Sequence, residues 1–304
     1  MIETMGLCKA YGGTQVLQDV GFCAPTSTIT GFLGANGAGK TTAMRLMLGL
    51  EVGAGTTRYD GRRLLDWPDP ARVVGAVVDA GTFAPTVPVV RQLTALARAC
   101  GVDARTRPAE VLELVGLSDV AGAAPRTFSL GMTQRLGLAA AMLGDPRVLI
   151  LDEPANGLDP PSMHWLRHWL RDLADEGRTV LLSSHLLSEL QLLADRVVVL
   201  AGGRVVAEQE MVSFLARGPG EAVRVETPDP ELLLDAVAAL GAVVEPDGDV
   251  PGAYRVLGTD RQLLAEQLWS RGARLSLLAS EPRSLEDAYL DVAGLGAHAV
   301  GQLA

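Results

Sequence analysis

A glycine-rich loop carries the clearest chemical signal in the sequence. It matches the pattern G-x-x-x-x-G-K-[ST] and lies between a predicted strand and a predicted helix. Its glycines let the backbone curl so that successive N–H groups point at phosphate oxygens, and the helix N-terminus adds positive potential. Lys40 supplies a point charge for β- and γ-phosphates, and the Thr41 hydroxyl is a ligand for Mg²⁺. We therefore predict a triphosphate site formed by Gly34, Ala35, Asn36, Gly37, Ala38, Gly39, Lys40, Thr41 and Thr42.

Two adjacent carboxylates follow an apolar strand at residues 148–151. In open α/β folds, ligands bind beyond the carboxyl ends of the strands, which is where Asp152 and Glu153 are expected. Asp152 would hold Mg²⁺, directly or through water, and Glu153 would polarise the attacking water. Together with the phosphate loop, this pair favours hydrolysis of a nucleotide over a solvated strand end.

The elements that must position these residues alternate in type along the first half of the chain. β-Rich runs at residues 28–33, 73–78, 148–151 and 179–183 predict strands, and residues 42–50 predict a helix. Residues 197–200 and 204–207, joined by two glycines, favour a hairpin. The Ala/Leu-rich region of about 90–145 has helical spacing and is interpreted as a helical insertion. This alternation predicts an α/β fold with a largely parallel sheet.

A change in composition near residues 217–220 marks a predicted domain boundary. Beyond it we expect strands at 222–226, 242–245, 254–256 and 275–278, and helices at 230–240, 260–271 and 284–292. That order resembles a small split-βαβ unit of about 80 residues. The domains are thus predicted as 1–218 and 221–304, the second a small α+β accessory domain.

Composition and charge exclude several classes of function. The 26 basic and 36 acidic residues give a net charge of −10, and the sequence contains no Lys/Arg run that could form a footprint for nucleic-acid phosphates. The N-terminus carries acidic Glu3 where a signal peptide would be basic. No stretch approaches the roughly 20 apolar residues of a membrane helix. We expect a cytoplasmic chain that does not itself cross a membrane and binds no nucleic acid.

With these motifs in order, the chain resembles the ATP-binding cassette (ABC) family of ATPases. Residues 128–135, Phe-Ser-Leu-Gly-Met-Thr-Gln-Arg, match the signature loop at a helix N-terminus, with Leu130 and Met132 where Gly and Gln are commonest. The resemblance implies that Ser129 and the amides around Gly131 and Met132 donate to a γ-phosphate. The form SLGM is similar to that of drug- and antibiotic-exporting members.

Four further residues take roles that the resemblance implies. Residues 156–159 are similar to the D-loop, in which Asp159 touches the opposite subunit, and His185 resembles the switch histidine that senses the γ-phosphate. Tyr11 matches the aromatic residue that stacks on adenine. Asp79 stands where a glutamine is usual, and we expect it in the Mg²⁺ shell and in coupling to the membrane partner. An aspartate accepts hydrogen bonds but cannot donate as an amide does.

The resemblance also implies the architecture and the partners. It implies a P-loop NTPase fold with a RecA-like core, an antiparallel β subdomain and a helical subdomain, and ATP with Mg²⁺ as the cofactors. The signature loop completes the ATP site of a neighbouring cassette, so one loop of each kind implies a C2 homodimer with two equivalent ATPs. A separate transmembrane permease would hold the chain at the cytoplasmic face of the membrane, and the helical region would transmit motion to it.

Export is favoured over import by analogy, from the SLGM loop, Asp79 and residues 285–290, which are similar to the C-terminal segment of antibiotic exporters. Two other functions stay open at this point. A soluble ABC ATPase acting on ribosomes or DNA usually has a second cassette, a basic linker or special insertions, none of which is seen here. A regulatory module that does not hydrolyse is favoured only by Asp79.

Overall fold

The computed structural model describes residues 1–78, 83–216, 222–247, 251–281 and 284–293. The chain divides into two compact units, Met1–Met211 and Val212–Ala304, which are treated separately below. The short helix α7 (Met211–Leu215) spans the division. The expected boundary at residues 217–220 lies outside the described residues.

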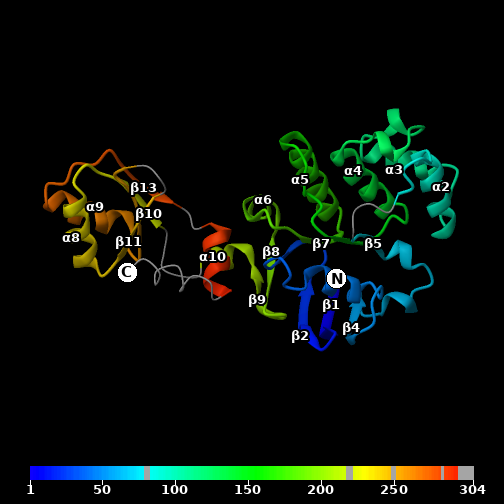
Figure 1. The fold of residues 1–304 in the computed structure, drawn as a ribbon, viewed down its shortest axis with the longest axis horizontal. Coiled ribbons are helices and arrows are strands. Elements are labelled where there is room, and N and C mark those ends of the chain that lie inside the picture. Colours follow the sequence, from blue (N-terminus) through cyan, green and yellow to red (C-terminus); the bar gives the residue numbers. More distant parts are fainter. Residues whose placement is uncertain (79–82, 217–221, 248–250, 282–283, 294–304) are drawn as a thin grey trace. The chain divides into compact units, whose positions relative to one another are not determined.

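A mixed sheet forms the centre of the first unit (Figure 1). Neighbouring strands across it are β5 (Val74–Val77), β6 (Val148–Leu151), β7 (Thr179–Ser183), β3 (Ile29–Leu33), β8 (Arg196–Ala201) and β9 (Arg204–Glu210). The pairs from β5 to β8 are parallel, and β9 returns antiparallel to β8. Every residue of β3, β6 and β7 is buried, which explains their continuous apolar runs. The predicted α/β fold with a parallel sheet is confirmed.

A second, antiparallel sheet of the same unit has the order β2-β1-β4. Its strands are β1 (Ile2–Tyr11), β2 (Thr14–Ala24) and β4 (Ala54–Tyr59). Side chains from these strands share one core with helix α1 (Lys40–Met47) and with the large sheet. The sequence pattern did not reveal the three strands, because irregularities in the β1 register interrupt the alternation of apolar and polar residues.

Helices cover the opposite face of the large sheet (Figure 1). They are α4 (Leu130–Ala141), α5 (Pro160–Asp175) and α6 (Leu187–Leu193), with α2 (Val89–Ala99) and α3 (Arg107–Leu114) packed beside α4. The region of about 90–145 is therefore helical in the structure. No helix of the described residues is both long and apolar enough to span a bilayer.

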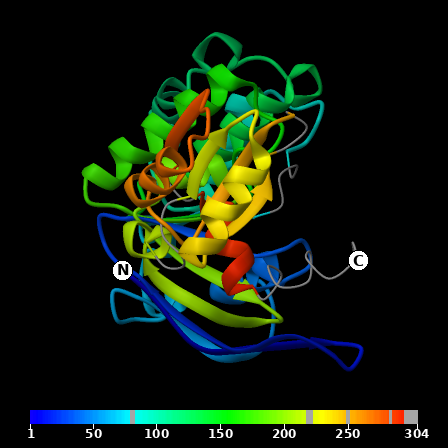
Figure 2. The ribbon, with the colours of Figure 1, turned by 90° about the vertical axis from the view of Figure 1, so that its left-hand side faces the viewer.

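The second unit, which is coloured yellow to red in Figure 2, contains an antiparallel sheet and helices. The strand order of this sheet is β11-β12-β10-β13. The elements of the unit are β10 (Ala222–Glu226), α8 (Pro230–Leu240), β11 (Val243–Pro246), β12 (Ala253–Leu257), α9 (Arg261–Ser270), β13 (Leu277–Glu281) and α10 (Leu285–Val292). Apolar residues of β10, β12, α8 and α9 form its core. This element order and strand order are those of the split-βαβ unit that the sequence predicted.

Close packing of α4 on β5 gives a test of the first unit. A Cβ added at Gly75 would lie 2.2 Å from the carbonyl oxygen of Ala141, so the Gly75→Ala variant must separate helix and sheet. We expect a loss of about 1–3 kcal/mol in the free energy of unfolding, measured by urea denaturation. The control Gly122→Ala should cost far less, because a Cβ at Gly122 meets nothing within 4 Å. Equal stability of both variants would contradict this packing.

An ion pair gives a pH test of the second unit. Arg274 donates two side-chain hydrogen bonds to Asp229, at 2.7 and 3.0 Å, and these lower the pKa of the carboxyl from 3.8 to about 2. The ionised pair therefore stabilises the fold above about pH 4, and this contribution is lost as the pH falls toward 2. Thermal melting of the wild type and Asp229→Asn should differ at pH 5, and the difference should shrink steadily as the pH falls from about 4 through about 2. A constant difference would refute the assignment.

Candidate functional site

The glycine-rich loop connects β3 to α1 and borders a pocket of about 260 Å³. Gly39 precedes α1 with φ +103°, where an L-residue is strained, and a Cβ there would lie 2.7 Å from Leu17 Cδ2. Glycine is thus required for the loop to pass this close to β2. The lining residues are Val16, Ala35, Asn36, Gly37, Gly39, Lys40, Thr41, Thr42, Asp152 and Glu153.

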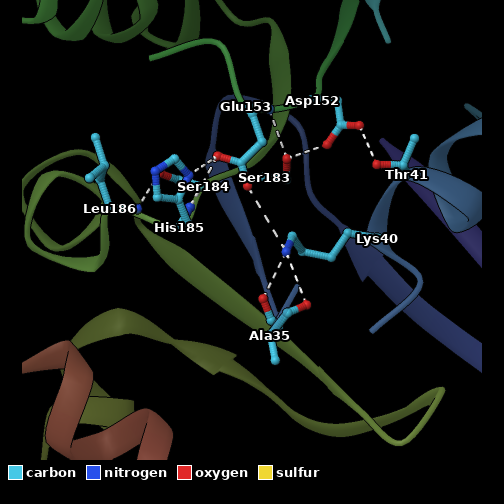
Figure 3. Close-up of polar contacts among 10 residues, drawn as sticks. Ala35, Lys40, Thr41, Asp152, Glu153, Ser183, Ser184, His185 and Leu186 are labelled. Carbon is cyan, nitrogen blue, oxygen red and sulfur yellow. Dashed lines mark hydrogen bonds and ion pairs between the residues drawn. The ribbon is translucent and has the colours of Figure 1, made fainter. Parts of the chain in front are cut away.

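Lys40 lies at the floor of this pocket, only 7% exposed. Its ammonium group donates hydrogen bonds to the carbonyl oxygens of Gly34, at 2.7 Å, and Ala35, at 3.4 Å (Figure 3). Its Nζ is 4.0 Å from Glu153 Oε1, and Asp152 is the second carboxylate that lines the pocket. The ammonium group of Lys40 can also donate to phosphate oxygens, and a divalent cation would offset the charge of the two carboxylates.

Asp152 connects the loop to the neighbouring strand ends. The Thr41 hydroxyl donates to Asp152 Oδ2 and the Ser183 hydroxyl donates to Asp152 Oδ1, both at 2.5 Å (Figure 3). A hydroxyl beside a carboxylate is the kind of hard-oxygen donor set that Mg²⁺ takes in phosphate sites. Among the described residues no group of three or more His, Cys, Asp or Glu could hold a metal, so Mg²⁺ would complete its shell with phosphates and water.

Glu153 has an unusual backbone conformation, with φ +50°. Its N–H donates to Ser183 Oγ at 2.8 Å, which ties the residue to the end of β7. His185 makes two contacts with the same carboxylate oxygen, Glu153 Oε2, through its Nδ1 at 2.6 Å and its backbone N–H at 3.2 Å. The His185 side chain is 45% exposed and that of Glu153 is 25% exposed, so both can reach a bound ligand.

Tyr11 lies at the end of β1, beside the phosphate loop but outside the residues that line the pocket. Its ring is exposed, and its hydroxyl donates to Glu51 Oε2. That hydrogen bond raises the pKa of Tyr11, and the Thr42 side chain acts in the opposite direction. An exposed ring next to Thr42 is available for stacking on a base.

The signature-loop residues gather in another pocket, of about 470 Å³. Ser129 caps α4 by accepting from the N–H of Met132 at 3.2 Å, and Asp159 caps α5 by accepting from the N–H of Ser162 at 3.0 Å. The hydrogen bonds from Ser162 also lower the pKa of Asp159. Gly131 lies between the two caps, and two helix N-termini therefore open into one space.

The two pockets have no lining residue in common. The predicted residues 34–42, 152, 153 and 185 gather at the edge of the large sheet, while Ser129, Gly131, Met132 and Asp159 gather at the start of α4 and α5. Ala38 packs against the core rather than facing the pocket, and its N–H donates to Ala35 at 3.0 Å. Asp79 lies outside the described residues.

Sequence reasoning missed three contributors. Ser183 was predicted only as the last residue of the strand at 179–183, yet it bridges Asp152 and Glu153. Its position as the last residue of a buried strand was the available signal. Val16 in the phosphate pocket and Arg135 in the signature pocket carried no separate signal.

A phosphate loop between parallel strand β3 and a helix, with a carboxylate at the end of β6 on the far side of β7, defines a P-loop NTPase. The comparisons with known proteins narrow this class. A model of the ABC transporter family matches residues 17–156. The Nod factor export ATP-binding protein I of Paraburkholderia xenovorans is 35% identical over 302 residues, covering 96% of this chain and 97% of that protein.

Two further comparisons agree. The bacitracin transport ATP-binding protein BcrA of Enterococcus faecalis is 39% identical over 211 residues, 68% of either chain. A solved structure of an ATP-binding subunit of an ABC transporter superposes with a TM-score of 0.64 and 28% identity, covering 70% of this chain and 91% of that one. This chain belongs to the ABC transporter family, as an ATP-binding subunit with ABC-type ATPase activity.

Removal of the Ser183 hydroxyl tests the site geometry. The Ser183→Ala variant leaves one oxygen of Asp152 and the N–H of Glu153 without their shared partner. We expect kcat for ATP to fall about 10- to 100-fold with little change in ATP binding. Ser184→Ala is the matched control, because Ser184 Oγ accepts from the N–H of Leu186 and, within the described residues, forms no hydrogen bond with Asp152 or Glu153. Similar kcat values for the two variants would contradict the bridging role.

Proposed function

We propose that two copies of this chain form a C2 homodimer that closes around two ATP molecules. The separation of the two pockets is the observation that supports it: one chain has a phosphate pocket and a signature pocket with no shared residue. In an isologous interface, each pocket of one copy can face the other pocket of its partner. Both ATP sites would then be complete, and equivalent.

The residues of the phosphate pocket support a hydrolytic mechanism. Lys40 would balance the charge of the β- and γ-phosphates, and Thr41 and Asp152 would hold Mg²⁺. When bound, Mg²⁺ would neutralise charge on the phosphate oxygens. Glu153 would align the attacking water, and His185, which already contacts Glu153 at 2.6 Å, would hold the γ-phosphate.

The partner copy would complete each site. Its Ser129, with the N–H groups around Gly131 and Met132, would donate to the γ-phosphate, and its Asp159 would lie across the interface. Tyr11 would stack on the base. ATP binding would close the pair, and hydrolysis with phosphate release would reopen it.

For the wider assembly we propose a separate transmembrane permease and an export function. The names of two relatives, a Nod factor export protein and a bacitracin transport protein, support it. The export proposal is also supported by the SLGM signature and by the C-terminal segment at 285–290. It is further supported by Asp79, to which we assign a role in the Mg²⁺ shell and in coupling to the permease. The chain would lie at the cytoplasmic face of the membrane through its permease, with a drug, an antibiotic or a lipid-like compound as cargo.

The domain assignment is part of the same proposal. Residues 1–218 would bind ATP, with the helical region of about 90–145 transmitting motion to the permease. Residues 221–304 would form an accessory domain. The match to the Nod factor export protein, which covers 97% of that protein, supports a role for both parts in one type of transporter.

The decisive assay is the ATPase rate per chain as a function of chain concentration. A composite site predicts that this rate rises with concentration as dimers form. Glu153→Gln should abolish hydrolysis while ATP is retained, giving a dimer that persists on a sizing column. Lys40→Ala should instead weaken ATP binding itself. A constant rate per chain down to high dilution would refute the dimer, and normal single-turnover hydrolysis by Glu153→Gln would remove Glu153 from its role.

A further inference from the structure

The signature loop carries a large apolar residue where the family most often has glycine. Leu130 is the first residue of α4, and it is 55% exposed in the signature pocket. Because much of its side chain stays exposed, burial of Leu130 contributes little to the stability of this chain. The contacts of the Leu130 side chain therefore indicate what this residue does.

Its neighbour is Gly157 in the D-loop. Gly157 has φ +70°, and a Cβ added there would lie 2.1 Å from Leu130 Cδ2 and 3.4 Å from Cγ. The first distance is far below any real contact, so the leucine side chain rests directly on the glycine backbone. A side chain at position 157 would therefore have to displace the end of the Leu130 side chain.

Contacts on either side continue this packing between the start of α4 and the start of α5. A Cβ at Gly131 would reach Leu158 Cδ2 at 3.5 Å and Ser162 Oγ at 3.6 Å, so the loops are in ordinary contact there. One turn further along α4, the Arg135 guanidinium lies 4.2 Å from the ring centroid of Trp165 on α5.

These contacts connect two groups with assigned roles. Ser129, the cap of α4, precedes Leu130, and Asp159, the cap of α5, follows Gly157 by two residues. The contact between Leu130 and Gly157 therefore lies directly between Ser129 and Asp159 in the packing of the two loops. The contacts of Gly131 and Arg135 lie further along α4.

We propose that Leu130 is a positioning residue for ATP hydrolysis: its side chain packs on Gly157 and holds the signature loop and the D-loop as one unit. This inference rests on the proposed function, in which Ser129 and Asp159 of one copy serve the ATP of its partner. The phosphate pocket does not contain Leu130, so the contact affects kcat rather than the binding of ATP to a single chain.

A double-mutant cycle tests the contact. The four chains are the wild type, Leu130→Ala, Gly157→Ala and the double variant, assayed for kcat, KM and binding of a fluorescent ATP analogue. Gly157→Ala should reduce kcat about 10- to 100-fold, because the leucine is pushed away and Ser129 shifts with it. Leu130→Ala should lower kcat to a similar extent, since alanine at 130 lacks the Cγ and Cδ atoms that make the contact, and the double variant should be no slower than the slower single variant, because both changes remove the same contact. Binding of the analogue should stay the same in all four chains.

Two controls separate positioning from folding. Gly101→Ala carries the same backbone strain, with φ +69°, but its Cβ would meet nothing within 4 Å, so its kcat should match the wild type. Leu130→Met keeps an apolar side chain of similar volume and should retain most of kcat. Melting temperatures above the assay temperature for all chains exclude loss of fold as the cause.

The following results would contradict the positioning role of Leu130. If Leu130→Ala keeps full kcat, if the losses of the two single variants multiply in the double variant, or if Gly157→Ala is as fast as Gly101→Ala, the contact has no positioning role. Ser129→Ala tests the premise separately. If it keeps full kcat at a concentration where dimers form, the signature loop does not serve the site, and the proposed function fails together with this inference.

Discussion

The hydrogen-bonded bridge through Asp152 is the interaction on which the rest of the site depends. Its two carboxylate oxygens accept from Thr41 and Ser183, each at 2.5 Å, so three separate loops meet at one carboxylate. Such a meeting requires that β3, β6 and β7 be parallel neighbours that end at the same edge of the sheet. The register of β3 against β7, and of β7 against β6, fixes the distance between the phosphate loop and the hydrolytic residues.

The bridge explains how one chain can hold the reactants, and the second pocket is the basis of our proposal that a second chain completes the site. Ser129 and Asp159 each cap the N-terminus of a helix and line the signature pocket, which shares no lining residue with the pocket around Lys40. Charge neutralisation of a triphosphate is most effective when donors surround it, and the signature pocket offers a second set of donors that the phosphate pocket lacks. A dimer that brings the second set of donors to the γ-phosphate couples chemistry to closure, as a transport cycle requires.

Local motifs and the periodicity of buried strands predicted the phosphate loop, the carboxylate pair and the split-βαβ order of the second unit. They failed where long-range pairing decides the structure. The apolar run at 275–278 predicted a strand there, but the strand begins at Leu277 and continues to Glu281, because β13 follows its pairing with β10. The role of Ser183 could not be predicted either, since it depends on which strand ends become neighbours. The packing of Leu130 on Gly157 likewise joins residues whose contact no local pattern reveals.

The central claim, that each ATP site needs two chains, is tested most directly by mixing two inactive variants. Lys40→Ala lacks a working phosphate loop but keeps its signature loop, and Ser129→Ala has the opposite defect. A mixed dimer contains one intact composite site, so an equal mixture should recover up to about a quarter of wild-type activity, because about half of the dimers are mixed and each has one working site of two. No activity above that of the separate variants would contradict the account and place hydrolysis within a single chain.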